Sequence, residues 1–217
     1  ETLVSFTANP MMHNAPLLCF WGPALFFGGE VAIAPRSDIE AIGEVILSRR
    51  PNWAVISPVH LRRLSEKGAL DVESFSRIYG LATPSGAPAL RAALGAPAFH
   101  LYGMTEGLLT FGRAGDSDLA IELTVGQPTI PHDEIRLVIP GTTEDVPPGG
   151  IGELIVRGPC TISGYFDSPE RNAEAFTADG YYRSGDLMSF RIIDGKRYLR
   201  FEGRVKDVVD RAGEKIN

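Results

Sequence analysis

Four short apolar runs separated by helical patterns fill the first half of the sequence, and this alternation restricts the fold more than any other feature. The predicted strands are Val31–Ala34, Trp53–Ile56, Tyr79–Ala82 and Phe99–Tyr102. The predicted helices between them begin after Asp38, at Pro58 and at Ala89. Strands that alternate with helices form a mostly parallel sheet, and ligands bind beyond the carboxyl ends of its strands. An α/β subdomain is therefore predicted over residues 1–125.

The second half of the sequence has predicted strands without long helices between them. Alternating or continuous apolar runs occur at Glu134–Ile139, Gly152–Arg157 and Arg197–Phe201. The stretch Pro147–Gly150 marks a hairpin-like turn between the first two runs. A small antiparallel β-barrel or sheet is therefore predicted over residues 126–203.

Composition and charge argue against several classes of protein. The 217-residue chain has a formal net charge of −6, which does not suit a general nucleic-acid or membrane-surface binder. Cys19 and Cys160 do not make a disulfide framework, so a cytoplasmic location is expected. The apolar segment Leu17–Phe27 is short and interrupted by Gly22 and Pro23, so neither a membrane span nor a signal peptide is predicted. The sequence opens without Met and stops just after a Gly-Glu-Lys turn, which predicts an internal fragment.

The stretch Leu101–Leu108 places one acid and one hydroxyl between two glycines, at the end of the fourth predicted strand. Gly103 and Gly107 lack a Cβ, so the backbone can approach a ligand closely there. Thr105 offers a hydroxyl and Glu106 a hard oxygen ligand, a combination that suits a polyphosphate with Mg²⁺. By spacing alone, such a stretch is more often only a turn at the end of a strand. The prediction of a site therefore depends on the other motifs.

A second acidic motif is Tyr182–Asp186, in which Asp186 follows a Ser-Gly pair. A carboxylate at such a turn can accept hydrogen bonds from both hydroxyls of a ribose. The alternative is a turn aspartate that bonds its own backbone. The charged stretch Glu202–Lys215 would, by itself, more often be a solvated strand edge than a site.

Four motifs in order resemble the core motifs of the adenylate-forming superfamily, which includes acyl-CoA ligases, luciferases and peptide-synthetase adenylation domains. They are Tyr102–Glu106, Gly152–Tyr165, Tyr182–Asp186 and Gly203–Asp207 with Gly213-Glu214. His13-Asn14 with Pro16-Leu17 resembles one branch, the stand-alone enzymes that activate 2,3-dihydroxybenzoate or salicylate. The resemblance implies part of a large N-terminal domain, with a hinge and the start of a C-terminal lid at residues 204–217.

The resemblance also implies a site for ATP and Mg²⁺. Glu106 would bind the metal and Thr105 the α-phosphate, and both would be catalytic together with His13. Asp207 resembles the hinge about which the lid rotates. The implied nucleotide-binding residues are Gly86, Ala87, Tyr102, Gly103, Thr105, Asp186 and Arg204.

Within that set, three residues have a more specific implied contact. Tyr102 would pack on the adenine, and Asp186 and Arg204 would hold the ribose hydroxyls. Gly86 and Ala87 would line the adenine and aryl pockets.

An aryl-acid pocket is implied by the same resemblance. Asn14 is suited to hold a hydroxyl ortho to the carboxylate. Cys19 stands where catechol-selecting relatives carry a serine, and a weak thiol donor favours a salicylate-like acid over dihydroxybenzoate; the alternative is that Cys19 is only a small core residue. Ala15 stands where an aromatic residue is usual, so the pocket is either enlarged for a bulkier or bicyclic acid or filled by Phe20 or Trp21. The implied pocket residues are His13, Asn14, Ala15, Cys19, Gly86, Thr105 and Leu109.

The implied function is the ATP-dependent conversion of an aryl acid to aryl-AMP, followed by transfer to the phosphopantetheine thiol of an aryl carrier protein in siderophore or nonribosomal peptide biosynthesis. The family's phosphate-binding loop would precede Glu1 and the lid lysine would follow Asn217, so this chain alone is expected to bind adenylate weakly and to turn over negligibly. An aryl-CoA ligase and a non-catalytic binding module with the same fold are the alternatives. The retention of four groups argues against the binding module: Glu106, Asp186, Arg204 and Asp207.

Overall fold

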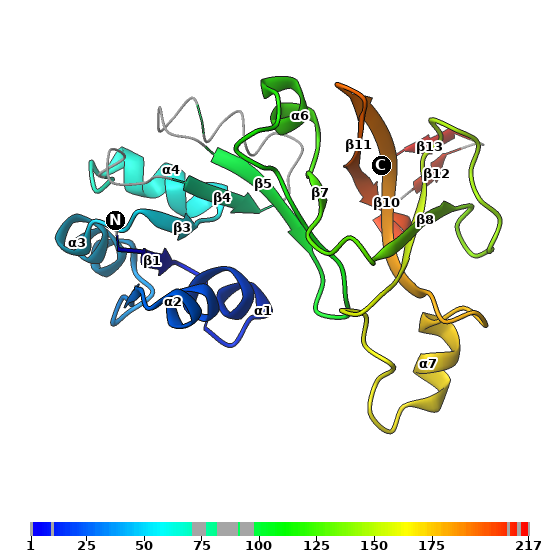
Figure 1. The fold of residues 1–217 in the computed structure, drawn as a ribbon, viewed down its shortest axis with the longest axis horizontal. Helices are drawn as coiled ribbons and strands as arrows, with labels where there is room; N and C mark the ends of the chain where they lie inside the picture. Colours follow the sequence, from blue (N-terminus) through cyan, green and yellow to red (C-terminus); the bar gives the residue numbers. More distant parts are fainter. Residues whose placement is uncertain are drawn as a thin grey trace. The chain divides into compact units, whose positions relative to one another are not determined.

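The structure is a computed structural model that describes residues 2–9, 11–70, 77–81, 91, 98–207, 209–211 and 214–216. The chain divides into two compact units, Glu1–Leu101 and Tyr102–Asn217. Strand β5 (Ala98–Gly103) carries the chain from the first unit into the second (Figure 1). The subdomain boundaries predicted at residues 125 and 203 stay predictions.

Five parallel strands form the sheet of the first unit, in the order β2-β1-β3-β4-β5. Their bounds are Val4–Thr7 (β1), Glu30–Ala32 (β2), Trp53–Val55 (β3), Arg77–Leu81 (β4) and Ala98–Gly103 (β5). The strand order reverses between β1 and β3, and sheets of this kind bind ligands at the carboxyl ends of the strands that flank such a reversal. The predicted parallel α/β fold is confirmed.

Helices connect the parallel strands. They are α1 (Asn14–Pro16), a π-helical turn η1 (Leu17–Trp21), α2 (Gly22–Phe27), α3 (Ile39–Arg49) and α4 (Pro58–Glu66). Helix α3 begins where the sequence predicts, because Asp38 Oδ1 accepts a hydrogen bond of 2.9 Å from the backbone N–H of Ala41. The helix predicted from Ala89 falls outside the described residues, apart from Arg91.

The core of the first unit forms where β1 and β3 pack against α3 and α4. Its buried residues are Phe6, Ala32, Ile42, Ile46, Ala54, Ile56, Leu61, Leu64 and Ala98. The three residues that end α2 are apolar and exposed instead: Leu25 is 70%, Phe26 85% and Phe27 75% exposed. Within the described residues, no helix is long and apolar enough to cross a membrane.

The second unit contains a four-stranded antiparallel sheet in the order β11-β10-β9-β8. The strands are β8 (Glu134–Val138), β9 (Gly152–Arg157), β10 (Tyr182–Ile193) and β11 (Lys196–Arg204). Among the described strands β8 does not pair with β11, so the antiparallel half is a half-barrel rather than a closed barrel.

Shorter elements complete the second unit. They are β6 (Leu109–Phe111), α6 (Asp118–Leu123), β7 (Gln127–Pro128), α7 (Pro169–Ala175), a 3₁₀ turn η3 (Val205–Asp207), β12 (Val209–Arg211) and β13 (Glu214–Ile216). Gly126 joins β7 to β11, because its C=O accepts a hydrogen bond of 3.0 Å from the N–H of Leu199. Gly126 has φ +85°, and a Cβ there would lie 1.9 Å from the carbonyl oxygen of Phe111.

Candidate active site

The loop after β5 forms a closed turn that carries Glu106. The N–H of Met104 donates to the C=O of Leu108 over 3.1 Å, and the N–H of Gly107 donates to the C=O of Met104 over 3.3 Å. At the tip of this turn Thr105 is exposed and Glu106 is half-buried. The predicted hydroxyl and carboxylate are therefore both presented by one short turn.

The two glycines of this turn pack against the protein. A Cβ on Gly103 would lie 2.7 Å from Cδ1 of Leu109, and a Cβ on Gly107 would lie 3.2 Å from Oγ1 of Thr161. Both separations are shorter than ordinary van der Waals contact. These glycines thus have a packing role, in addition to the close approach of a ligand predicted from the sequence.

Asp186 is a buried carboxylate on β10 that two predicted site residues contact. Tyr102 Oη donates a hydrogen bond of 2.7 Å to Oδ2 of Asp186. Nε of Arg204, the last residue of β11, lies 3.2 Å from Oδ1 of the same carboxylate. Ser184 Oγ accepts a hydrogen bond of 3.0 Å from the N–H of Asp186, which fixes its backbone. The predicted pair Asp186 and Arg204 is thus brought together, with Tyr102 as a third member.

Burial dominates the electrostatics of this cluster. It raises the pKa of Asp186 above the usual value of a carboxyl group, although the hydrogen bond from Tyr102 and the charge of Arg204 oppose the shift. Burial and the neighbouring carboxylate also raise the pKa of Tyr102 well above its usual value. The phenol therefore stays protonated near neutral pH and acts as a donor to Asp186.

Glu106 takes part in a second cluster, made with two tyrosines. Tyr165 Oη donates a hydrogen bond of 2.8 Å to Oε1 of Glu106. The hydroxyls of Tyr165 and Tyr182 lie 3.2 Å apart. Tyr182 is the first residue of β10, and burial is the main cause that raises its pKa. Since Tyr165 donates to Glu106, it accepts from Tyr182, and the three groups form one directed chain of hydrogen bonds.

The two clusters join the same two segments of the second unit. Tyr102 and Glu106 lie on the end of β5 and the turn that follows it, whereas Asp186 and Tyr182 both lie on β10. The acid predicted to meet the phosphates and the acid predicted to meet the ribose are therefore both anchored to β10. Their contacts with a nucleotide stay predictions.

The groups present fit a nucleotide with Mg²⁺. Among the described residues, the only hydrogen bond to the Glu106 carboxylate goes to Oε1, which leaves Oε2 for a hard cation. The side chain of Arg204 is 55% exposed despite its contact with Asp186, so it can also meet a ligand. One carboxylate for the metal and a carboxylate–guanidinium pair for hydroxyl groups is the donor set that the sequence predicts.

The predicted aryl-acid residues of the first unit follow β1, at the edge where the strand order reverses. Nδ1 of His13 accepts a hydrogen bond of 3.2 Å from the N–H of Ala15 and so caps α1. His13 is exposed, whereas Asn14 and Ala15 are half-buried. The sheet thus places these three residues at the edge where this class of fold binds ligands.

Cys19 is a core residue of the first unit. It lies in the π-helical turn η1, its side chain is 1% exposed, and its C=O accepts a hydrogen bond of 2.6 Å from Nε1 of Trp53. Burial raises the pKa of the Cys19 thiol to about 12, so the thiol is neutral at physiological pH. A contact between this thiol and an aryl acid stays a prediction.

The remaining predicted site residues fall in several places. Gly86 and Ala87 lie outside the described residues. Leu109 begins β6 in the second unit. Asp207 ends η3, three residues after the end of β11, and its role as a hinge stays a prediction.

Tyr165 is a member of the Glu106 cluster to which the sequence assigns no role. It ends the motif Gly152–Tyr165, but a separation of 59 residues from Glu106 leaves no local signal of their contact. A contact between two loops of the second unit brings the two residues together, since the N–H of Ile162 donates to the C=O of Glu106 over 2.9 Å.

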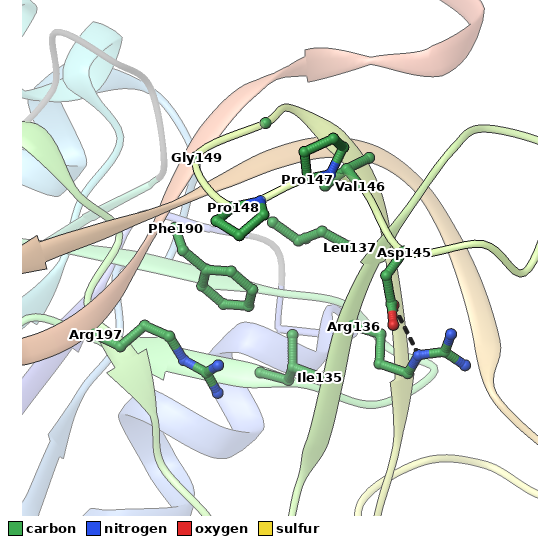
Figure 2. A pocket seen from close by; sticks show the side chains of 11 residues that line it. Ile135, Arg136, Leu137, Asp145, Val146, Pro147, Pro148, Gly149, Phe190 and Arg197 are labelled. Carbon is green, nitrogen blue, oxygen red and sulfur yellow. Dashed lines mark hydrogen bonds and ion pairs between the residues drawn. The ribbon is translucent and has the colours of Figure 1, made fainter.

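A separate pocket of about 230 Å³ lies on the half-barrel (Figure 2). Nε of Arg136 lies 2.9 Å from Oδ1 of Asp145 there, and the guanidinium of Arg197 lies 4.4 Å from the centre of the Phe190 ring. The pocket is smaller than the roughly 300–1,000 Å³ of typical ligand sites and contains no predicted site residue, so it is not the candidate active site. Its lining residues are Ile135, Arg136, Leu137, Asp145, Val146, Pro147, Pro148, Gly149, Gly150, Phe190 and Arg197.

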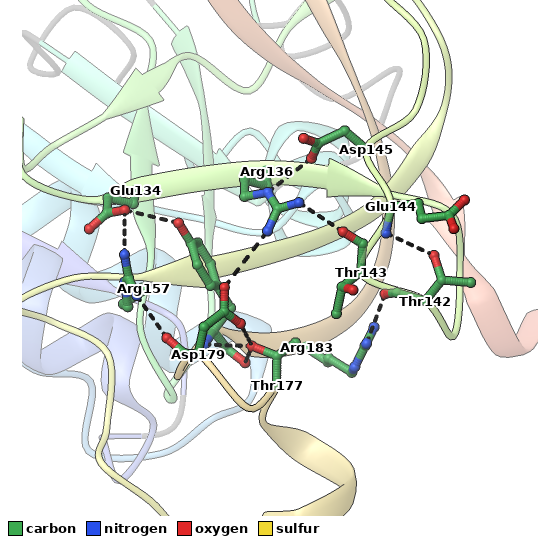
Figure 3. Close-up of polar contacts among 11 residues, drawn as sticks. Glu134, Arg136, Thr142, Thr143, Glu144, Asp145, Arg157, Thr177, Asp179 and Arg183 are labelled. Carbon is green, nitrogen blue, oxygen red and sulfur yellow. Dashed lines mark hydrogen bonds and ion pairs between the residues drawn. The ribbon is translucent and has the colours of Figure 1, made fainter.

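A polar cluster that includes Glu134, Arg157 and Asp179 holds β8 and β9 to the segment before β10 (Figure 3). Oε2 of Glu134 accepts from Oη of Tyr181 over 2.9 Å and from Arg157 over 2.8 Å. The guanidinium groups of Arg157 and Arg136 lie 4.6 and 5.5 Å from the centre of the Tyr181 ring. None of these residues is a predicted site residue, so the cluster is assigned a structural role.

Comparison with known proteins gives a consistent set of relatives. Residues 1–166 match the family described as AMP-binding enzyme. The salicyl-AMP ligase / salicyl-S-ArCP synthetase of Mycobacterium tuberculosis is 38% identical over 94% of this chain and 37% of its own length. The 2-hydroxy-7-methoxy-5-methyl-1-naphthoate–CoA ligase of Streptomyces carzinostaticus is 39% identical over 96% of this chain and 38% of its own length.

A solved structure shows the same fold. The apo structure of MbtA from Mycobacterium smegmatis superposes with a TM-score of 0.84 at 33% identity, over 99% of this chain and 41% of that chain. The chain therefore spans about two fifths of the length of the proteins that it matches.

Proposed function

This chain belongs to the AMP-binding enzyme family, and from that premise we propose that the protein carrying it uses ATP to activate an aryl acid as the aryl adenylate. The proposed acid is a salicylate-like 2-hydroxyaryl acid. The proposed acceptor of the aryl group is the phosphopantetheine thiol of a carrier protein. A relative that is 38% identical and named as a salicyl-AMP ligase and salicyl-S-ArCP synthetase supports both choices.

One observation supports this proposal most strongly. Tyr102 at the end of β5 and Glu106 in the turn that follows are each tied by hydrogen bonds to β10, the first at Asp186 and the second at Tyr182 through Tyr165. A stable turn alone would not require both the Glu106 carboxylate and the Asp186 carboxylate. A nucleotide with Mg²⁺ does, since it presents a metal at its phosphates and two hydroxyls at its ribose.

In the proposed first step, a carboxylate oxygen of the aryl acid attacks the α-phosphorus of ATP. The bond from that phosphorus to the bridging oxygen breaks, and pyrophosphate leaves with the electron pair. Mg²⁺ would neutralise phosphate charge when bound. Glu106 would hold the metal, Thr105 would donate its hydroxyl to the α-phosphate, and Asp186 would accept from the ribose hydroxyls. Such a step depends on alignment and charge neutralisation more than on proton transfer.

In the proposed second step, the sulfur of the acceptor thiol attacks the carbonyl carbon of the aryl adenylate. The bond from that carbon to the phosphate oxygen breaks, AMP leaves with the electron pair, and the thiol proton passes to solvent. No covalent intermediate with this chain is required.

The choice of acid rests on the first unit. Asn14 follows β1 at the ligand-binding edge and is suited to hold a 2-hydroxyl group. Cys19 is buried and neutral, so it is at most a weak donor to a second hydroxyl. Both features favour an acid with one ortho hydroxyl over a catechol.

A second candidate function is an aryl-CoA ligase. The relative with 39% identity is named as a CoA ligase for a bicyclic 2-hydroxyaryl acid. Ala15, where an aromatic residue is usual in the family, is consistent with a larger ring. The two candidates differ in the acceptor, so the acceptor decides between them.

The test is aryl-acid-dependent exchange of pyrophosphate into ATP by the full-length protein that carries this chain. A panel of salicylate, 2,3-dihydroxybenzoate, benzoate and a 2-hydroxynaphthoate is expected to give the fastest exchange with a 2-hydroxyaryl acid. Glu106→Ala is expected to abolish most of the exchange. Exchange that is absent with every acid, or unchanged in Glu106→Ala, would contradict the proposal. Transfer to a carrier protein but not to coenzyme A would support the first acceptor over the second.

A further inference from the structure

The carboxylate of Glu106 is oriented by a residue that does not belong to its turn. Its Oε1 accepts from the hydroxyl of Tyr165 over 2.8 Å. Its backbone C=O accepts a hydrogen bond of 2.9 Å from the N–H of Ile162. The segment from Ile162 to Tyr165 therefore holds Glu106 at both the main chain and the end of the side chain.

Tyr165 is itself held by α7. The amide of Asn172 bonds both backbone groups of Tyr165, because Oδ1 accepts from its N–H over 2.7 Å and Nδ2 donates to its C=O over 2.9 Å. The guanidinium of Arg171 lies 3.8 Å from the centre of the Tyr165 ring. Gly164 makes this arrangement possible, since it has φ +153° and a Cβ there would lie 3.2 Å from Nδ2 of Asn172. The phenol is thus fixed by its backbone, its ring and its hydroxyl.

The hydroxyl of Tyr165 accepts a hydrogen bond from Tyr182 and donates one to Glu106. Tyr182 lies 3.2 Å from it, and the phenol of Tyr182 keeps its proton because burial raises its pKa. With Tyr182 as donor, Tyr165 has its single proton available for Oε1 of Glu106. Phe176, which follows α7, packs edge-on against Tyr182, with the two ring centres 5.4 Å apart. This contact supports Tyr182 at the start of the hydrogen-bonded series Tyr182–Tyr165–Glu106.

We propose that Tyr165, fixed by Asn172 and Arg171 of α7, is a positioning residue that turns the free oxygen of Glu106 toward the metal of the metal–nucleotide complex. This inference rests on the proposed role of Glu106 as the metal ligand. A carboxylate with one oxygen committed to a fixed donor has one preferred orientation for the other oxygen, so less freedom is lost when the metal binds. Partners that orient a metal ligand in this way typically change metal affinity by about 10–100-fold when removed.

A substitution that removes only the hydroxyl of Tyr165 separates positioning from simple stabilisation. Tyr165→Phe keeps the ring, its contact with Arg171 and both backbone bonds to Asn172, and it removes only the hydroxyl. A matched control exists in the same unit, since Tyr181 donates a hydrogen bond of 2.9 Å to the carboxylate of Glu134, away from the site. Tyr181→Phe therefore removes a tyrosine–carboxylate hydrogen bond of nearly the same length without touching Glu106.

The experiment measures Mn²⁺ affinity in the presence of ATP by electron paramagnetic resonance, and the Mg²⁺ dependence of pyrophosphate exchange, on the full-length protein and both variants. Tyr165→Phe is expected to weaken metal binding and to raise the Mg²⁺ concentration for half-maximal exchange by roughly 10-fold. Exchange at saturating Mg²⁺ is expected to recover most of its rate. Tyr181→Phe is expected to leave both metal constants unchanged.

The outcomes distinguish this inference from the proposed function. Equal metal constants in Tyr165→Phe and the unsubstituted protein, with exchange intact, would overturn the inference and leave the proposed function standing. Metal–nucleotide binding without exchange on any aryl acid would overturn the proposed function, and the shift in Mn²⁺ affinity would still decide the inference. A protein that binds no metal with ATP would overturn both. Asn172→Ala, which frees the backbone of Tyr165, is expected to shift the metal constants in the same direction by a smaller factor.

Discussion

The hydroxyl of Tyr102 lies 2.7 Å from Oδ2 of Asp186, across 84 residues of sequence, and donates to it. Tyr102 lies at the end of β5 that belongs to the second unit and Asp186 lies on β10, so this hydrogen bond joins the end of β5 to β10. The rings of Tyr102 and Phe201 also lie 6.3 Å apart, which adds β11 to the same contact. The predicted ribose acid is therefore held on one side by a phenol and on the other by Arg204.

Asp186→Asn is expected to weaken AMP binding by the full-length protein roughly 10-fold or more. The change keeps the shape of the side chain but removes the charge, and hydrogen bonds to charged groups contribute about 1.5–3 kcal/mol. Tyr102→Phe is the comparison, because it removes the donor while the carboxylate stays charged. Isothermal titration calorimetry should give a smaller loss of affinity for Tyr102→Phe. Equal affinity for AMP in Asp186→Asn and the unsubstituted protein would rule out the ribose role.

Asp133→Asn is expected to raise the melting temperature at pH 7. Within the described residues, both carboxylate oxygens of Asp133 are buried without a hydrogen-bond partner, and burial raises its pKa above the usual value. Since the folded pKa lies above the unfolded value of about 3.9, Asp133 contributes stability below about pH 4 and loses it as the pH rises through the folded pKa. A gain of 1 kcal/mol would appear as roughly 2–4 °C for a chain of this size.

The pH dependence supplies the control for that prediction. The advantage of Asp133→Asn should shrink as the pH falls to 4, when the parent carboxyl is protonated as well. Asp179→Asn should not raise the melting temperature at pH 7, because a hydrogen bond of 2.6 Å from Thr177 lowers the pKa of Asp179. A pH-independent gain in Asp133→Asn would show that the penalty is not electrostatic.

Gly126→Ala is expected to destabilise the second unit by more than backbone strain alone. A Cβ at this position would overlap the carbonyl oxygen of Phe111, and φ is +85°. Gly195→Ala is the matched control, since Gly195 has φ +75° with no atom within 4 Å of its would-be Cβ. The control should cost about 1–2 kcal/mol, and Gly126→Ala should cost clearly more in thermal or urea unfolding. An equal loss of stability in Gly126→Ala and Gly195→Ala would show that the carbonyl group of Phe111 shifts to make room for the Cβ at little cost.

Thiol titration is expected to find one cysteine that reacts quickly with the reagent and one that reacts slowly. Cys160 is exposed, whereas Cys19 is buried and the pKa of its thiol is raised to about 12. An aromatic disulfide reagent at pH 8 should therefore react quickly with Cys160 only, and denaturant should release the second thiol. Cys160→Ser should remove the fast phase. A fast phase that persists in this variant would place Cys19 at the surface.

Local patterns were sufficient to predict much of the fold. The apolar periodicity of Ile39, Ile42 and Ile46 after Asp38 predicted α3, and the structure confirms both the helix and its capping hydrogen bond. Strand β9 has the bounds Gly152–Arg157 that the apolar run predicted. These features depend on neighbours within a few residues, so sequence alone carries the signal.

Contacts between distant residues could not be predicted in the same way. The motifs identified Glu106 and Asp186, but neither spacing nor composition indicates that Tyr165 donates to the first or Tyr102 to the second. The π-helical turn at Leu17–Trp21 was not predicted from the sequence either. The resemblance to a family indicates the candidate residues, whereas their hydrogen-bond partners are known only from the tertiary structure.

The exposed apolar end of α2 is expected to affect the solution behaviour of the 217-residue polypeptide when it is prepared by itself. Leu25, Phe26 and Phe27 present three large apolar side chains in succession to water. Surfaces of this kind adhere to one another, so the 217-residue polypeptide is expected to self-associate as its concentration rises. Replacing Phe26 with a lysine should keep it dispersed in light scattering at concentrations where the unaltered polypeptide forms clusters.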